Sequence, residues 1–188
     1  MKKSIVKVGT FAVTESETGE VTYGAVEWLE SKKSGGREYS AEPNGEVTEI
    51  YADGRVVYSV EDNNGYTIKL VLLALIDKIA KDWLGYTVDA AKKATAEYAD
   101  GKERPHFGLA IAESTTEGTT QITFYYDCQV TKRPTKSGKT TEGKFEAQFA
   151  EFELAARPRE SDSLVCYELE CSTLVTTVPE PNSQEQGE

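Results

Sequence analysis

The sequence predicts a mainly β protein with one short α-helix over about residues 75–84. Several segments alternate between apolar and polar residues with a period of two, which is typical of strands that bury one face. In residues 66–72 the apolar members of this alternation are Tyr66, Ile68, Leu70 and Leu72. Asp, Asn and Gly, the residues that tight turns require, separate the alternating segments.

Residues 47–85 show the most consistent local pattern in the chain. Two turns, at residues 52–54 and 62–65, separate three predicted strands. The period changes at residue 75 to that of a helix, whose apolar face contains Ile76, Ile79, Ala80 and Trp83. Gly85 then supplies the helix stop. We expect this meander to form the core of the fold, with its helix covering one face of a sheet.

The second half of the chain also predicts β structure. Residues 121–130 should form a strand with an inner face made of Ile122, Phe124, Tyr126, Cys128 and Val130. Tyr125 and Asp127 would then lie on its outer face. Residues 144–154 should form another strand, in which the apolar pattern slips by one residue. We therefore expect a β-bulge near residues 150–151.

The length of the chain favours one domain, which we place at residues 1–178. It should have an N-terminal arm over about residues 1–20. Polar composition predicts long loops at about residues 30–37, 89–104 and 134–143. Residues 179–188 contain no apolar side chain larger than proline, and we expect them to be a disordered acidic tail.

Composition narrows the possible partners and locations. The formal net charge of −11 argues against non-specific binding to nucleic acid, because such binding depends on Lys and Arg. The longest apolar run is far too short for a transmembrane helix, and no signal peptide is recognisable, so we expect folding in a cytoplasm. The three cysteines, Cys128, Cys166 and Cys171, lack metal-ligand spacing and are expected to be buried free thiols.

No motif in the sequence predicts catalysis, a cofactor or a metal site. Residues 138–140 resemble the end of a phosphate-binding loop, but Arg133 replaces the required glycine and Pro134 interrupts the pattern. His106 is the only histidine, and we expect it to begin a strand rather than to act as a base. Residues 62–65 lack the remaining ligands of a calcium loop. We therefore do not expect an enzyme.

An ordered series of segments resembles the major tail tube protein of long, non-contractile-tailed bacteriophages. The series spans roughly residues 20–160, and its order carries the resemblance, since no single motif is specific. The segments are Ile50-Tyr51-Ala52-Asp53-Gly54, Val57-Tyr58, Asn64-Gly65-Tyr66-Thr67, residues 70–76, Asp82-Trp83-Leu84-Gly85, His106-Phe107-Gly108-Leu109-Ala110, residues 124–130, Arg133-Pro134 and residues 145–154. The helix lacks the proline that often opens it in relatives. The tail after Pro179 is also shorter than the immunoglobulin-like domain that some relatives append.

The resemblance implies a tail-tube-type β-sandwich or barrel-like unit with one flanking helix. Six copies would form a ring, and stacked rings would form the conduit for phage DNA during ejection. The implied partners are further copies of the chain and the tape measure, tail terminator and distal tail proteins. DNA would pass without specific binding, because an acidic lumen repels its phosphates. The implied location is the virion tail, assembled in the host cytoplasm, without a membrane contact or a cofactor.

Two groups of site residues follow from this resemblance. The outward face of the strand at residues 144–154 would line the lumen through Glu146, Gln148 and Glu151. A polar loop would form a contact between subunits or rings through Thr135, Lys136, Ser137, Gly138 and Lys139.

Two other functions fit the same pattern. The first is another β-rich tail component, such as a tail terminator or distal tail protein, or the related tube of a contractile secretion system. The second is an acidic β-sandwich that binds carbohydrate or protein through exposed aromatic residues such as Tyr125.

Overall fold

The structure, a computed structural model of the chain, describes residues 5–53, 55–99, 101–114, 119–136 and 149–181. These residues form one nine-stranded sheet, two two-stranded sheets and two short helices. The predicted mainly β class is therefore confirmed. The expectation of a single helix is wrong, because a second helical turn, α1 (Ser31–Ser34), forms where Lys33 and Ser34 donate from their backbone N–H groups to Glu30 O.

The large sheet is antiparallel, and its strand order departs from the order in sequence. Neighbouring strands are β2 (Val21–Tyr23), β1 (Ile5–Glu15), β10 (Phe107–Ser114), β11 (Thr120–Lys132), β12 (Ala150–Ala156), β7 (Tyr66–Leu72) and β4 (Gly36–Pro43). In addition, β13 (Cys166–Cys171) pairs with β11, and β3 (Glu27–Trp28) pairs with β1. Residues 5–15, expected to belong to an N-terminal arm, thus form a strand inside the sheet.

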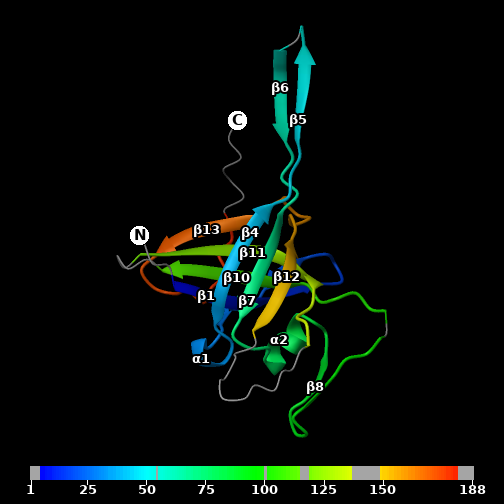
Figure 1. Ribbon diagram of the computed structural model, residues 1–188, viewed down its shortest axis with the longest axis vertical. Helices are drawn as coiled ribbons and strands as arrows, with labels where there is room; N and C mark the ends of the chain where they lie inside the picture. Colours follow the sequence, from blue (N-terminus) through cyan, green and yellow to red (C-terminus); the bar gives the residue numbers. More distant parts are fainter. Residues whose placement is uncertain (1–4, 54, 100, 115–118, 137–148, 182–188) are drawn as a thin grey trace, which may run out of the picture.

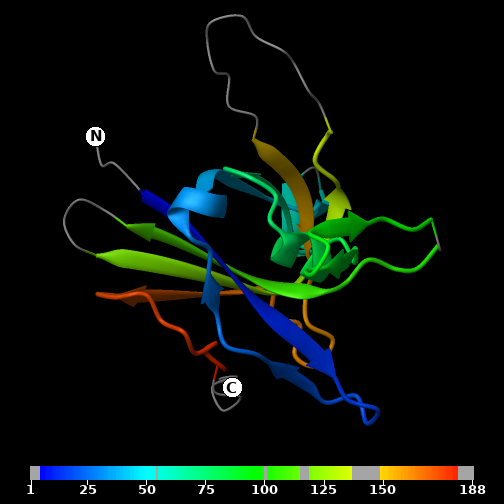
Figure 2. The ribbon, with the colours of Figure 1, turned by 90° about the horizontal axis from the view of Figure 1, so that it is seen from below.

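The sheet folds over itself at β11. The first half of β11 pairs with β13 and the second half with β12, so that β12, β7 and β4 cross over β10 and β11 (Figure 1, Figure 2). At Gly36, β4 approaches β1 so closely that a Cβ would lie 2.5 Å from the Val8 side chain. No ladder joins β4 to β1 in the described residues, so this sheet is curled and open rather than a closed barrel.

The two layers enclose the larger of two apolar clusters. Helix α2 (Asp77–Asp82) closes one end of this cluster, and Ile79 and Trp83 are fully buried there. Trp83 stacks on Phe107 with 4.5 Å between the ring centroids. Gly85 follows with a φ of 72°, which confirms both the predicted helix and its stop. Packing of the apolar face stabilises this helix, which is too short to be stable alone.

A second apolar cluster lies on the opposite face of β10 and β11. Its buried members are Phe11, Val26, Ala110, Ala112, Ile122, Phe124 and Tyr126. A C-terminal segment, residues 172–181, covers this cluster: Trp28 Nε1 donates to Val175 O at 2.8 Å, and Tyr126 OH donates to Pro179 O at 2.5 Å. Residues 179–181, expected in a disordered tail, thus lie on the body of the protein. Residues 182–188 are outside the described residues.

The prediction of one inner and one outer face for residues 121–130 is wrong, because both faces of β11 are buried. The ladder pairs Phe107 with Cys128 but Leu109 with Tyr125, so β11 carries one extra residue in between. Because of this β-bulge, Cys128 and Val130 share the larger cluster with Tyr125, which is 3% exposed. The other predicted inner residues face the second cluster, namely Ile122, Phe124 and Tyr126.

The bulge predicted near residues 150–151 is also wrong. β12 pairs with β7 in one unbroken register from Ala150 to Ala156, and Phe149 precedes the strand. A register shift occurs instead on β11, between Val130 and Lys132 opposite β12. Residues 144–148 of the predicted strand lie outside the described residues.

The predicted meander does not form one core sheet. Its turn residues are confirmed, because Asp53 and Gly65 have φ values of 52° and 95°. In the described chain, however, β5 (Val47–Ala52) and β6 (Arg55–Glu61) pair only with each other, whereas β7 pairs with β4 and β12. The β5–β6 hairpin projects far from the body (Figure 1). Alternation thus identified the strands, but their partners are set by contacts distant in sequence.

The predicted loop at residues 89–104 contains part of another small hairpin. β8 (Thr87–Asp89) pairs with β9 (Ala94–Ala96), and the Asp89 carboxylate accepts hydrogen bonds from the backbone N–H groups of Ala91 and Lys92. This Asx-type turn accounts for the reversal. Of the loop predicted at residues 134–143, the structure describes residues 134–136.

Candidate functional site

The β5–β6 hairpin presents large apolar side chains to solvent. Val47, Ile50, Tyr51 and Tyr58 are 57%, 56%, 63% and 60% exposed. Clustered exposure of this kind is typical of an interaction surface. Ile50 and Tyr51 are neighbours in sequence and break the period of two. This break is the sequence signal that could have indicated a hairpin with no continuous buried face.

Polar contacts fix the base of this hairpin to the sheet. The Asn44 backbone N–H donates to Gly65 O at 2.8 Å, and the Asn64 N–H donates to Asn44 O at 2.7 Å. Thr67 Oγ1 on β7 donates to Asn44 Oδ1 at 2.9 Å. Only glycine fits at position 65, because a Cβ would lie 2.0 Å from Ala156 O. The hairpin therefore leaves the sheet at a defined point.

The structure describes three of the eight predicted site residues. Glu151 is exposed on β12 opposite Val71, and with Thr135 it lines an open hollow of about 710 Å³ over β4, β7 and β12. Lys136 pairs with Glu97 at 3.2 Å. The structure thus brings Glu151 and Thr135, predicted for two separate sites, to one hollow. The remaining five lie outside the described residues: Glu146, Gln148, Ser137, Gly138 and Lys139.

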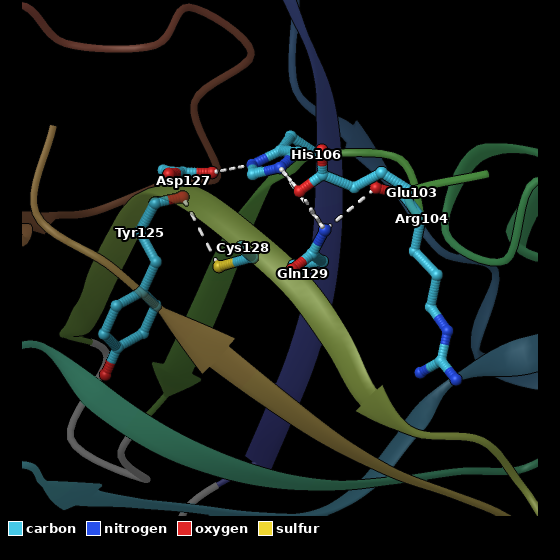
Figure 3. A network of polar contacts seen from close by, with 7 residues as sticks. All are labelled: Glu103, Arg104, His106, Tyr125, Asp127, Cys128 and Gln129. Carbon is cyan, nitrogen blue, oxygen red and sulfur yellow. Dashed lines mark hydrogen bonds and ion pairs between the residues drawn. The ribbon is translucent and has the colours of Figure 1, made fainter. Parts of the chain in front are cut away.

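A polar network surrounds His106 immediately before β10 (Figure 3). His106 Nδ1 lies 2.6 Å from Asp127 Oδ1, and Nε2 lies 3.4 Å from Glu103 Oε1. Gln129 Nε2 donates to Glu103 Oε1 at 3.3 Å and to Arg104 O at 3.0 Å. The sequence does not predict this network, because Asp127 and Gln129 lie more than 20 positions from Glu103, Arg104 and His106 and meet them only in the folded chain.

A second polar contact lies within the folded sheet. The Tyr39 and Tyr125 hydroxyl groups are 2.5 Å apart, and the Tyr66 ring meets the edge of Tyr125 with centroids 5.7 Å apart. Burial raises the pKa of Tyr39 to about 12, against a lowering by its hydrogen bond to Tyr125. The pKa of Tyr125 is also raised, chiefly by burial.

The three cysteines are free, as predicted, but the expectation that all three are buried is wrong, because Cys166 and Cys171 are partly exposed. Cys128 is fully buried, and burial raises the pKa of its thiol well above the ordinary value. Burial also raises the pKa of Cys166. Both thiols are therefore weak nucleophiles at neutral pH.

No protein-family model matches the chain, and a search of curated proteins finds no match. In the described part of the chain, no group of three or more His, Cys, Asp and Glu side chains is placed to hold a metal ion. No helix in that part is long and apolar enough to cross a membrane. The structure itself defines a mainly β protein with a curled antiparallel sheet and a projecting hairpin.

Proposed function

We propose that the protein is a structural subunit that assembles with copies of itself. More particularly, we propose a major tail tube subunit of a long, non-contractile-tailed bacteriophage. Six copies form a ring in this proposal, and stacked rings form the conduit for DNA ejection. The tape measure, tail terminator and distal tail proteins are its further partners. The ordered series of segments over residues 20–160 supports the particular assignment.

The exposed side chains of the β5–β6 hairpin carry the proposal of self-assembly. Full burial of one such side chain contributes about 1.5–3 kcal/mol. Four of them, Val47, Ile50, Tyr51 and Tyr58, lie on one ribbon that extends away from its own sheet. An isolated two-stranded ribbon is only marginally stable in water. Contact with a second copy would bury these side chains and stabilise the ribbon.

The overall net charge, rather than any one surface, supports a role around DNA. The net charge is −11, and Glu38, Glu151 and Glu153 line the hollow on the outer face of β4 and β12. Lys69, Lys132 and Arg133 lie among them, so the charge of the hollow is mixed. A surface with an overall negative charge releases no counterions from DNA and therefore does not retain it.

The hairpin provides a direct test. We expect the double variant Ile50→Ser, Tyr51→Ser to need at least about tenfold higher concentration to assemble, as measured by sedimentation velocity. Tyr98→Ser is the matched control, because Tyr98 is 68% exposed outside this hairpin. Assembly of the double variant at wild-type concentrations would contradict the proposed role of the hairpin.

The ligand-binding alternative loses Tyr125, the aromatic residue given as its example. Tyr125 is 3% exposed and its hydroxyl contacts Tyr39, so its ring does not line a surface groove. Another β-rich tail component remains the second candidate, since a projecting hairpin also suits a subunit that forms single rings.

A further inference from the structure

His106 joins residues 101–106 to β11, which no backbone ladder joins in the described part of the chain. The ladder between β10 and β11 begins at the pair Phe107 and Cys128. Before it, residues 101–106 lead from the β8–β9 hairpin and lie along β11 (Figure 3). Side chains hold them there: Arg104 Nη1 donates to Val130 O at 2.6 Å and to Thr131 O at 3.1 Å.

Both ring nitrogens of His106 face carboxylates, one from each side of this junction. Asp127 belongs to β11 and stands within its bulge, whereas Glu103 belongs to the docked segment. The imidazolium form can donate from Nδ1 to Asp127 and from Nε2 to Glu103 at the same time. It therefore links the segment to the strand.

The neutral form must change one of these contacts. If the proton stays on Nδ1 toward Asp127, Nε2 becomes an acceptor and opposes the Glu103 oxygen at 3.4 Å. Gln129 Nε2 lies 3.3 Å from His106 Nε2 and can donate to it. The same side-chain nitrogen, Gln129 Nε2, donates to Glu103 Oε1 and to Arg104 O. Loss of the proton thus sets His106 and Glu103 in competition for one amide.

We propose that His106, Asp127 and Glu103 form a pH-responsive latch, which holds residues 101–105 on β11 when His106 is protonated and loosens them when it is neutral. This inference stands apart from the proposed assembly. It concerns the local stability of one segment in the single chain.

The charges around His106 favour its protonated form, in which the latch holds residues 101–105 on β11. Burial, the largest contribution, lowers the pKa of His106, but the hydrogen bonds and charges of Asp127 and Glu103 outweigh it and raise the pKa above 6.5. The hydrogen bond from Gln129, followed by the hydrogen bond and the charge of His106, lowers the pKa of Glu103. Burial opposes this lowering, and the charge of Arg157 adds to it.

Other charges near His106 are largely paired with one another. Glu27, Lys78, Lys81 and Asp82 share with His106 an open hollow of about 320 Å³ between β1 and α2. Lys78 lies 3.0 Å from Glu27 and 3.2 Å from Asp82. Because the folded-state pKa is raised, the latch contributes its full stability below the ordinary pKa of 6.5. That contribution is lost as pH rises through the folded-state pKa.

Hydrogen exchange at two pH values tests the latch. Exchange of residues 101–106 is measured at about pH 6 and about pH 8.5 and corrected for intrinsic rates. We expect corrected protection to fall by about two- to fivefold at the higher pH, the range for exposed ion pairs. His106→Gln should abolish this pH dependence. Equal corrected protection of the wild type at both pH values would overturn the proposal.

A titration of the His106 ring by nuclear magnetic resonance provides the second measurement. Asp127→Asn should lower the pKa of His106, whereas Asp82→Asn, in the same hollow but paired with Lys78, should leave it nearly unchanged. Equal effects of the two variants would contradict the latch, even if the His106→Gln variant does not fold.

Discussion

The ring of Phe11 lies directly against the backbone of Gly108, its partner across the ladder between β1 and β10. A Cβ at Gly108 would come within 1.9 Å of Phe11 Cε2. Phe11 is 2% exposed and also meets the edges of Tyr23 and Tyr126, so its ring has no free space to move into. The second apolar cluster therefore depends on the absence of a side chain at position 108.

Gly108→Ala should destabilise the protein by about 3 kcal/mol, because the methyl group overlaps a ring fixed in close packing. Chemical denaturation measures this loss. Gly24→Ala is the matched control, since a Cβ there meets Ala12 at the ordinary distance of 3.4 Å, and its cost should stay below about 1 kcal/mol. Equal losses in the two variants would contradict the packing described.

Thr10→Val should cost about 2 kcal/mol, because it leaves a buried indole N–H without an acceptor. Trp83 Nε1 donates to Thr10 Oγ1 at 2.9 Å, and Thr10 Oγ1 donates to Gly108 O at 3.2 Å. Thr10→Ser keeps the hydroxyl and should lose much less. Thermal unfolding measures the stability of both variants. A serine variant as unstable as the valine variant would exclude the hydrogen bonds as the cause.

Alkaline pH should weaken the fold through Tyr39. Its pKa is about 12 in the folded protein, against 10.0 ordinarily, because burial opposes ionisation. The contribution of neutral Tyr39 to the stability of the fold is therefore complete below pH 10 and is lost as pH rises toward about 12. Denaturation at a series of pH values should show that the free energy of unfolding falls less steeply with pH for Tyr39→Phe than for the wild type. Tyr98→Phe, at an exposed position, should match the wild type.

Arg159→Ala should release the C-terminal segment, residues 172–181. The Arg159 guanidinium pairs with Asp162 and, at 3.0 Å, with Glu180, and it lies 4.7 Å from the centre of the Tyr126 ring. We expect faster hydrogen exchange in residues 174–181 and a stability loss of about 2 kcal/mol. Arg37→Ala, which removes the more exposed stack on Phe149, should leave that exchange unchanged.

Local patterns predicted elements well and partners poorly. The helical spacing of Ile79 and Trp83 led correctly to a buried face, and the turn at Gly65 has the expected backbone. Local patterns could not show that β7 belongs to the large sheet and β6 does not, because the partners of β7 are residues 36–43 and 150–156, which are distant in sequence. Sheet partners are a property of the whole chain.

The bulge and the network near it show the same limit. One extra residue on β11 reverses the face of Cys128 and Val130, and no composition signal marks it. His106 and Asp127 are 21 positions apart and meet only through that register. The β5–β6 hairpin does carry a signal in the sequence. Ile50 and Tyr51 are adjacent large residues, so they break the alternation of a strand that buries one face.

Electron microscopy of the purified protein over a range of concentrations tests the central proposal most directly. We expect rings that stack into tubes, and we expect the Ile50→Ser, Tyr51→Ser double variant to form them only at higher concentration. Single rings that never stack would favour a terminator or distal tail protein instead. A strict monomer at every concentration, without rings or tubes, would contradict the proposed self-assembly.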